Sequence, residues 1–124
     1  MNLKLQSYKN CLSNNWKLKI TDGAVCKSFR RLGDMNFERP LYSHQEESIR
    51  RICSGRSAII TTGTGSGKTE SFLYPILNEL MSDVEKGNME VGVRAIFLYP
   101  MNALVNDQID RVRKILTQCP EITS

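Results

Sequence analysis

The residues with the clearest chemical potential form one glycine-rich run, Thr62-Gly63-Thr64-Gly65-Ser66-Gly67-Lys68-Thr69. Glycines at alternate positions let the backbone adopt positive φ angles and bring its N–H groups close to a compact anion. The last glycine is followed by a cation and a hydroxyl, the side chains that contact polyphosphate and Mg²⁺ in phosphate loops. The spacing therefore predicts a polyphosphate-binding loop, with Lys68 at the β- and γ-phosphates and Thr69 as a ligand of Mg²⁺.

A glycine-rich turn without a ligand is the alternative interpretation of this run. The generic pattern also places a glycine five residues before Gly67, where this chain has Thr62. The context favours the phosphate loop, because an apolar stretch precedes the run and a helical pattern follows it. The nucleotide-contacting residues expected here are Thr62, Gly63, Thr64, Gly65, Ser66, Gly67, Lys68, Thr69 and the neighbouring Glu70.

Two elements must position this loop. Residues 57–61 are small, branched or apolar and predict a buried strand that ends at the loop. Residues 68–81 predict a helix, and Pro75 inside it is expected to bend the helix rather than end it. The apolar positions of that helix recur at spacings of three and four, at Phe72, Leu73, Ile76, Leu77 and Leu80.

A second strand and helix follow. Residues 82–91 predict an exposed connection, residues 94–99 a second buried strand that Pro100 stops, and residues 103–117 a helix. The apolar side of that last helix is formed by Val105, Ile109, Val112 and Leu116. Two apolar strands that alternate with amphipathic helices predict an α/β fold with parallel strands flanked by helices.

The amino-terminal part is less regular. Residues 38–56 predict a short helix, opened by Pro40, capped by Ser43 with Glu46 three residues later, and closed by Gly55. Residues 1–37 predict short helices or irregular structure. Turns are expected there at Asp22-Gly23 and Gly33-Asp34.

Length and composition limit the classes of protein. The chain has 124 residues, 40% hydrophobic and 24% charged, which fits one folded domain. The net charge of +4 divides into +6 over residues 1–56 and −2 over residues 57–124, so the first half permits a polyanionic partner. No apolar run approaches the length of a membrane span. Scattered cysteines and a single histidine predict reduced thiols in a cytoplasmic protein and no zinc site.

Three segments resemble one family. The loop from Thr64 to Thr69 matches the x-x-T-G-x-G-K-T form of superfamily 2 helicases, which tolerate a non-glycine residue at the Thr62 position. Residues 40–45 resemble the glutamine motif of that family, and residues 99–108 resemble its motif Ia. The sequences of residues 70–77 and 99–104 are most similar to those of DEAD/DEAH-related, YprA-like bacterial helicases.

The resemblance covers about residues 38–117 and implies a domain organisation. Residues 38–124 are expected to form the first part of a RecA-like P-loop NTPase domain, and residues 1–37 an extension of uncertain structure. No apolar strand ends in an aspartate or glutamate that would hold Mg²⁺, and the family's D-E-x-x motif is absent. The chain is therefore expected to be an amino-terminal portion of a helicase, catalytically incomplete by itself. An exposed strand edge would favour marginal stability or self-association.

The resemblance also implies roles for single residues. Gln45 is expected to read adenine, since its amide offers an acceptor and donors together, with Tyr42 or Phe37 stacking on the base. Pro100, Met101 and Asn102 are expected to contact a nucleic-acid backbone through N–H groups at a helix start. The alternatives are an exposed polar glutamine, core aromatics, and an ordinary turn with Asn102 as N-cap.

Basic residues next to these motifs have two interpretations. They would steer nucleic acid toward the site or form a solvated basic face. They are Lys27, Arg30, Arg31, Arg50, Arg51 and Arg56.

The function expected from loop and resemblance together is the ATP-binding portion of an ATP-dependent nucleic-acid helicase. ATP and Mg²⁺ would be its cofactors, and DNA or RNA the partner of the whole protein. A different P-loop enzyme, such as a small-molecule kinase, would explain the loop but not Gln45 or residues 99–108. A non-catalytic nucleic-acid-binding module that keeps the loop as a scaffold is the third possibility.

Overall fold

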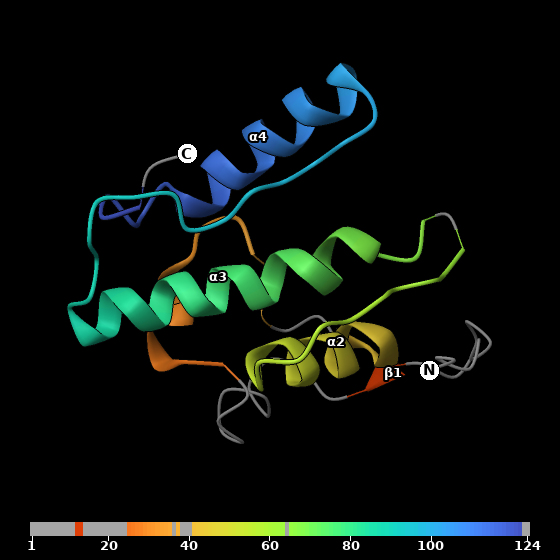
Figure 1. Cartoon of the computed structure of the whole chain (residues 1–124), viewed down its shortest axis with the longest axis horizontal. Coiled ribbons are helices and arrows are strands. Elements are labelled where there is room, and N and C mark those ends of the chain that lie inside the picture. The colour runs from red at the N-terminus through yellow and green to blue at the C-terminus, as the bar shows by residue number, and fades with distance from the viewer. Residues whose placement is uncertain (1–11, 14–24, 36, 38–40, 64, 123–124) are drawn as a thin grey trace.

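Three α-helices form the framework of the described part of the chain (Figure 1). The computed structural model describes residues 12–13, 25–35, 37, 41–63 and 65–122. Three sequence-based expectations lie outside these residues, those at Pro40, at the Asp22-Gly23 turn and at Thr64. The elements are β1 (Leu12–Ser13), the 3₁₀ helix η2 (Lys27–Arg31), β2 (Leu41–Tyr42), α2 (Ser43–Cys53), α3 (Lys68–Lys86) and α4 (Asn102–Leu116).

Helix α2 lies within the predicted range but has a different start. Its N-cap is Tyr42 rather than Ser43, and the Tyr42 N–H donates to Oε1 of Gln45 at 2.9 Å. This side-chain acceptor satisfies a backbone donor at the helix entrance. At the other end, Gly55 takes a left-handed conformation with φ 77°, which closes the helix as predicted.

Helix α3 is longer than predicted. It continues through Ser82–Lys86, which the sequence assigned to a connection, and ends where Gly87 adopts φ 71°. Nothing in that stretch breaks a helix before the glycine does. Pro75 lies inside α3 and does not end it, as expected.

The core lies where α2, α3, η2 and the end of α4 meet. It is formed by Val25, Phe29, Leu32, Leu41, Ile49, Leu73, Leu77, Met81, Ile115, Leu116 and Cys119. Phe29 from η2 is fully buried and meets Tyr74 of α3 edge-on, with ring centroids 6.3 Å apart. The irregular amino-terminal region therefore supplies part of the core against which α3 packs.

The predicted buried strands do not form in the described residues. Residues 57–61 and 94–99 have no regular secondary structure, and Ile59, Ile96 and Leu98 are 79%, 76% and 90% exposed. The sheet present pairs β1 with β2 in antiparallel register, so the prediction of two buried strands is wrong for these residues. A strand needs hydrogen-bonding neighbours that local sequence cannot supply, and neither segment has one here.

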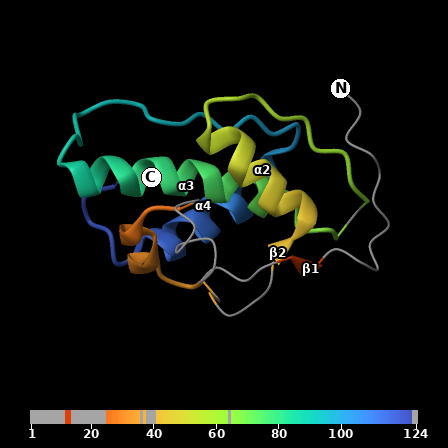
Figure 2. The same cartoon turned by 90° about the horizontal axis from the view of Figure 1, so that it is seen from below.

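The two segments nevertheless keep the direction expected of parallel strands. Both run along α3 toward the end of the molecule that carries the amino termini of α3 and α4 (Figures 1 and 2). The second segment, α3 and α4 enclose a mainly apolar hollow of about 680 Å³. The glycine-rich loop and residues 100–102 thus lie at the same end of the molecule.

Helix α4 begins at Asn102 with Met101 as its N-cap, so the prediction of Asn102 as N-cap is wrong by one residue. Its buried residues are Ile115 and Leu116, at the carboxyl end. Val105, Ile109 and Val112, which the pattern placed on an apolar face, line the hollow.

Candidate nucleotide-binding site

Two glycines of the glycine-rich loop have left-handed backbone conformations. Gly65 and Gly67 adopt φ angles of 74° and 71°, and Gly67 is the N-cap of α3. A residue with a Cβ rarely takes this left-handed conformation. The loop therefore delivers its backbone to the amino terminus of a 19-residue helix, whose free N–H groups and dipole favour a negative charge.

The side chains of the loop are bonded to the loop itself. Nζ of Lys68 donates to the carbonyl of Thr62 at 3.0 Å. The hydroxyls of Thr62 and Ser66 lie 2.5 Å apart, and Ser66 is 2% exposed. These contacts hold the two ends of the loop together. Lys68 itself remains exposed, with its ammonium over the loop.

Gln45 connects α2 to the loop. Its Nε2 donates to the carbonyl of Gly67 at 3.0 Å, while its Oε1 accepts from Tyr42. The residue is 4% exposed, and a Cβ on Gly67 would lie 2.5 Å from that Nε2. The glycine at position 67 is thus needed both for its backbone angle and for the close approach of Gln45. The sequence predicted Gln45 in the site but not this bond to the loop.

His44 lies beside the candidate site and was not predicted from the sequence. Its ring stacks on Tyr42, with centroids 5.6 Å apart and planes 9° from parallel, and its Nε2 is buried without a hydrogen-bond partner. Burial lowers the pKa of His44, and a backbone hydrogen bond to Ser66 and the charge of Glu70 partly oppose this. A histidine directly before the glutamine was the only signal available. Phe37 instead packs edge-on against Phe29, as a core aromatic.

Glu70 and Thr69 follow Lys68 in the first turn of α3. Both are partly buried, and Oε1 of Glu70 accepts a hydrogen bond from Arg111 of α4 at 2.5 Å. The carboxylate of Glu70 is therefore engaged with a second helix. The loop, the start of α2 and the first turn of α3 together bring Tyr42, His44, Gln45, Thr62, Gly63, Gly65, Ser66, Gly67, Lys68, Thr69 and Glu70 into one region.

Comparison with known proteins decides the family. The sequence profile of the DEAD/DEAH box helicases matches residues 42–123. The chain belongs to the DEAD/DEAH box helicase family. No solved structure matches it.

Several relatives support the helicase assignment. Druantia protein DruE of Escherichia coli is 45% identical over 80% of this chain and 6% of that protein. The ATP-dependent RNA helicase DBP7 of Meyerozyma guilliermondii is 34% identical over 95% of this chain and 17% of its own length. The uncharacterized ATP-dependent helicase YprA of Bacillus subtilis is 31% identical over 63% of this chain and 10% of its own. The chain thus spans a small fraction of the length of these relatives.

The turn that resembles motif Ia of the helicase family is exposed. Pro100, Met101 and Asn102 are all solvent-accessible, and Met101 is 61% exposed. They form the amino-terminal end of α4, at the same end of the molecule as the glycine-rich loop (Figure 1). The structure brings these two segments to the same end of the molecule (Figure 1).

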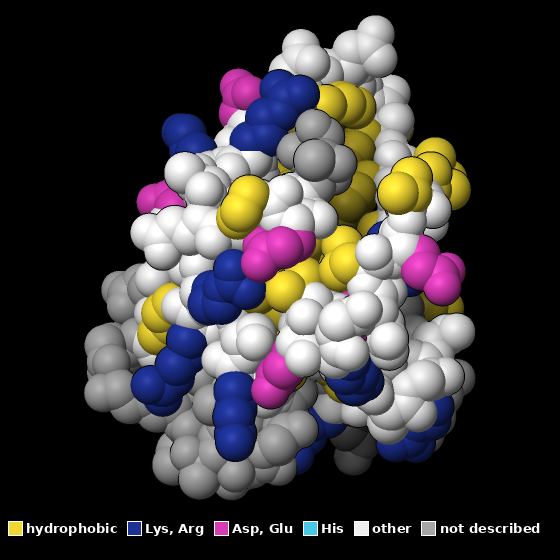
Figure 3. Space-filling view, turned by 90° about the vertical axis from the view of Figure 1, so that its left-hand side faces the viewer, with side chains coloured by type: hydrophobic (Ala, Val, Ile, Leu, Met, Phe, Trp, Pro, Cys, Tyr) yellow, Lys and Arg dark blue, Asp and Glu magenta, His cyan; other side chains and the backbone are white. Residues whose placement is uncertain are grey.

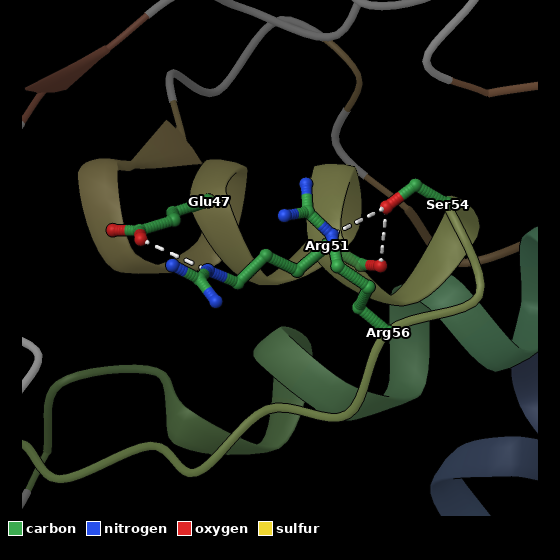
Figure 4. A network of polar contacts seen from close by, with 4 residues as sticks. All are labelled: Glu47, Arg51, Ser54 and Arg56. Carbon is green, nitrogen blue, oxygen red and sulfur yellow. Dashed lines mark hydrogen bonds and ion pairs between the residues drawn. The ribbon is translucent and has the colours of Figure 1, made fainter. Parts of the chain in front are cut away.

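Three of the basic residues next to the motifs form ion pairs, Arg31 with Glu121 and two others within α2. Arg50 and Arg51 form ion pairs with Glu46 and Glu47 one turn earlier on α2. Nε of Arg56 donates to the hydroxyl of Ser54, which donates to the carbonyl of Arg51 (Figure 4). Figure 3 shows Lys and Arg side chains mixed with Asp and Glu on one face, around a hollow with hydrophobic side chains. These contacts favour the interpretation of the basic residues as a solvated face over the interpretation that they steer nucleic acid.

Two further expectations concern thiols and membranes. Cys26, Cys53 and Cys119 are free thiols, and burial raises the pKa of each, which keeps them protonated. The residues that the structure describes contain no group of three His, Cys, Asp or Glu side chains able to hold a metal. In that same part of the chain, no helix is both long and apolar enough to cross a membrane.

Proposed function

We propose that residues 38–124 are the first part of a RecA-like helicase domain and bind the triphosphate of ATP through the loop of residues 62–69. The observation that carries this proposal is the pair of left-handed glycines, Gly65 and Gly67, directly before Lys68 at the amino terminus of α3. This geometry supports an anion cradle, because backbone N–H groups, a helix dipole and an ammonium meet at one point.

The residues present fit a nucleotide with Mg²⁺. Lys68 would exchange the Thr62 carbonyl for phosphate oxygens, since its ammonium already reaches over the loop. Thr69 would hold Mg²⁺ through its hydroxyl, as in other phosphate loops. Bound Mg²⁺ supplies charge neutralisation at the phosphates. Hydrolysis belongs to the whole protein, where a metal-binding carboxylate and a second lobe complete the site.

The base would be read beside α2. Gln45 uses each amide heavy atom once within the protein, which leaves one N–H and one lone pair for adenine. Tyr42 stacks on His44 and would extend that aromatic stack to the adenine ring. Thr64 is assigned to the phosphate-binding loop from the sequence pattern alone.

For the whole protein we propose ATP-dependent action on nucleic acid, with a place in the YprA-like group. The exposed turn Pro100-Met101-Asn102 would contact the sugar–phosphate backbone through N–H groups of α4. Met101 and Asn102 lack a positive charge, so backbone N–H groups are the expected donors. DNA and RNA share the phosphate chemistry on which this contact depends.

The decisive experiment is a titration of the chain with a fluorescent adenine nucleotide in the presence of Mg²⁺. We expect saturable binding that Lys68→Ala weakens at least about tenfold, because a charge-assisted contact to phosphate is worth about 1.5–3 kcal/mol. Lys86→Ala, at the opposite end of α3, is the matched control and should bind like the unaltered chain. Absence of saturable binding, or equal weakening by both variants, would refute the proposal.

Base selectivity separates helicase from kinase. Competition by ATP but not GTP is expected if Gln45 reads adenine, and Gln45→Leu should remove the preference. Equal competition by both nucleotides would favour a different P-loop enzyme. Salt-dependent binding of single strands without any nucleotide binding would favour a non-catalytic module.

A further inference from the structure

One carboxylate touches both the glycine-rich loop and α4. Oε1 of Glu70 accepts from Nη2 of Arg111 at 2.5 Å, across 41 residues of sequence. Its Oε2 lies 3.2 Å from the position that a Cβ on Gly67 would occupy. The Glu70 side chain is 15% exposed and that of Arg111 36%, so solvent screens this ion pair only in part. Glu70 is thus placed between the loop and α4.

Helix α4 is anchored at its carboxyl end. Ile115 and Leu116 are buried there, and the N–H of Gly33 donates to the carbonyl of Ile115 at 2.7 Å. Toward their amino termini α3 and α4 spread apart (Figure 1). In the described part of the chain, the Glu70–Arg111 pair is the ion pair that ties the two helices together. This geometry lets the amino-terminal half of α4 respond to the position of Glu70.

Binding of an anion in the loop can be transmitted to Glu70. Lys68 and Glu70 lie in the same first turn of α3, and Lys68 is bonded to the Thr62 carbonyl. A polyphosphate in the loop would compete with the Thr62 carbonyl for that ammonium, in the same turn that carries Glu70. Gln45 is bonded to the carbonyl of Gly67, the N-cap of α3, and Glu70 in the first turn of α3 is bonded to Arg111.

We propose that the Glu70–Arg111 pair is the positioning contact through which nucleotide in the loop fixes the amino-terminal half of α4. The inference rests on the nucleotide-binding function proposed above and adds a regulation to that same site. Glu70 acts on α4 through Arg111. The turn at residues 100–102 precedes α4 directly, so its placement would follow the state of the loop.

The test is amide hydrogen exchange of the full chain, with and without Mg²⁺ and a non-hydrolysable ATP analogue. Two regions are followed, residues 62–70 and residues 102–111. In the unaltered chain, the analogue should slow exchange in both regions, in the second by roughly fivefold or more, the size of a typical coupling between sites. Arg111→Gln, a change outside the nucleotide-contacting residues, should keep the protection of residues 62–70 and lose that of residues 102–111.

Two controls make the test specific. Glu121→Gln breaks the surface pair with Arg31, which lies 2.8 Å away, and should leave both responses intact. The double variant Glu70→Arg with Arg111→Glu reverses the pair and should restore the response of residues 102–111. Because this double variant keeps an ion pair, it tests the proposal even where a single variant folds poorly.

The two proposals fail in different ways. No protection of residues 62–70 at saturating analogue would refute nucleotide binding, and the inference with it. Protection of residues 62–70 without a response in residues 102–111 would overturn the inference alone. An unchanged response in Arg111→Gln, or a reversed pair that does not restore it, would also overturn the inference.

Discussion

The hydroxyl of Ser48 on α2 donates a hydrogen bond to the backbone carbonyl of Ser71 on α3. Pro75, four residues after Ser71, has no N–H, so α3 cannot supply the usual donor to this carbonyl. Ser48 and Ser71 are 3% and 0% exposed, which leaves little access for water. One side chain from α2 therefore makes a proline acceptable inside α3, about two turns after the glycine-rich loop.

Removal of the Ser48 hydroxyl should lower the free energy of unfolding most when Pro75 is present. Ser48→Ala leaves the buried Ser71 carbonyl without a donor and should lower the free energy of unfolding by about 1–3 kcal/mol. In a Pro75→Ala background the backbone N–H returns, and the same change should cost less than about 1 kcal/mol. Denaturant titrations of the four chains by circular dichroism measure both values. An equal cost in the two backgrounds would contradict the role assigned to Ser48.

The two left-handed glycines should differ in their tolerance of a methyl group. Gly65→Ala and Gly67→Ala each pay about 1–2 kcal/mol for the backbone conformation. At Gly65 a Cβ has open space, whereas at Gly67 it meets Nε2 of Gln45 at 2.5 Å. Gly67→Ala should therefore destabilise the chain more than Gly65→Ala, as measured by thermal unfolding.

Removal of the obstructing amide provides the control for this comparison. Gln45→Ala takes away the atom that a Cβ at position 67 would meet. In that background, the two glycine substitutions should have similar effects. A persistent difference would mean that another contact, not Gln45, restricts position 67.

His44 should make stability depend on pH. Burial lowers its pKa in the folded chain below the ordinary value of 6.5, so the unfolded chain binds more protons in this range. The stabilisation is present above pH 6.5, and the free energy of unfolding should fall as the pH drops through the lowered pKa. Urea titrations between roughly pH 5 and pH 7.5 follow this change.

The matched variant is His44→Gln, since His44 is the single histidine of the chain. It should flatten the pH dependence in that window, whatever it does to absolute stability through the lost stack on Tyr42. A slope that persists unchanged in the variant would assign the pH dependence to other groups.

Truncation of a side chain should destabilise the chain in the core but not in the exposed segment of residues 94–99. Leu77 is 1% exposed, and Leu77→Ala should cost about 2–5 kcal/mol of stability. Leu98 is 90% exposed, so Leu98→Ala should change stability by no more than about 0.5 kcal/mol. Chemical unfolding gives both values, at low concentration to exclude self-association. A large loss at Leu98 would mean that residues 94–99 are buried in solution.

Sequence reasoning succeeded where local chemistry decides the structure. Helix α3 and the loop before it were predicted because glycine conformation, apolar spacing and the helix start are properties of neighbouring residues. The end of α3 was misplaced by five residues because only Gly87, not the polar run before it, stops the helix.

The predictions that failed depend on distant parts of the chain. The apolar residues 57–61 and 94–99 signalled burial in a sheet, yet pairing requires a partner strand that the pattern cannot identify. The same limit applies to the site. Gln45 meets Gly67 across 22 residues and Glu70 meets Arg111 across 41, so no local motif marks these contacts.

The bond between the Lys68 ammonium and the Thr62 carbonyl has a consequence for affinity. In the proposed nucleotide complex, an arriving anion would meet a segment that folding has already arranged. It would replace a neutral acceptor of Lys68 with a charged one and require little further immobilisation. The affinity would then depend on the exchange of one acceptor for another, and dissociation would return Lys68 to the Thr62 carbonyl.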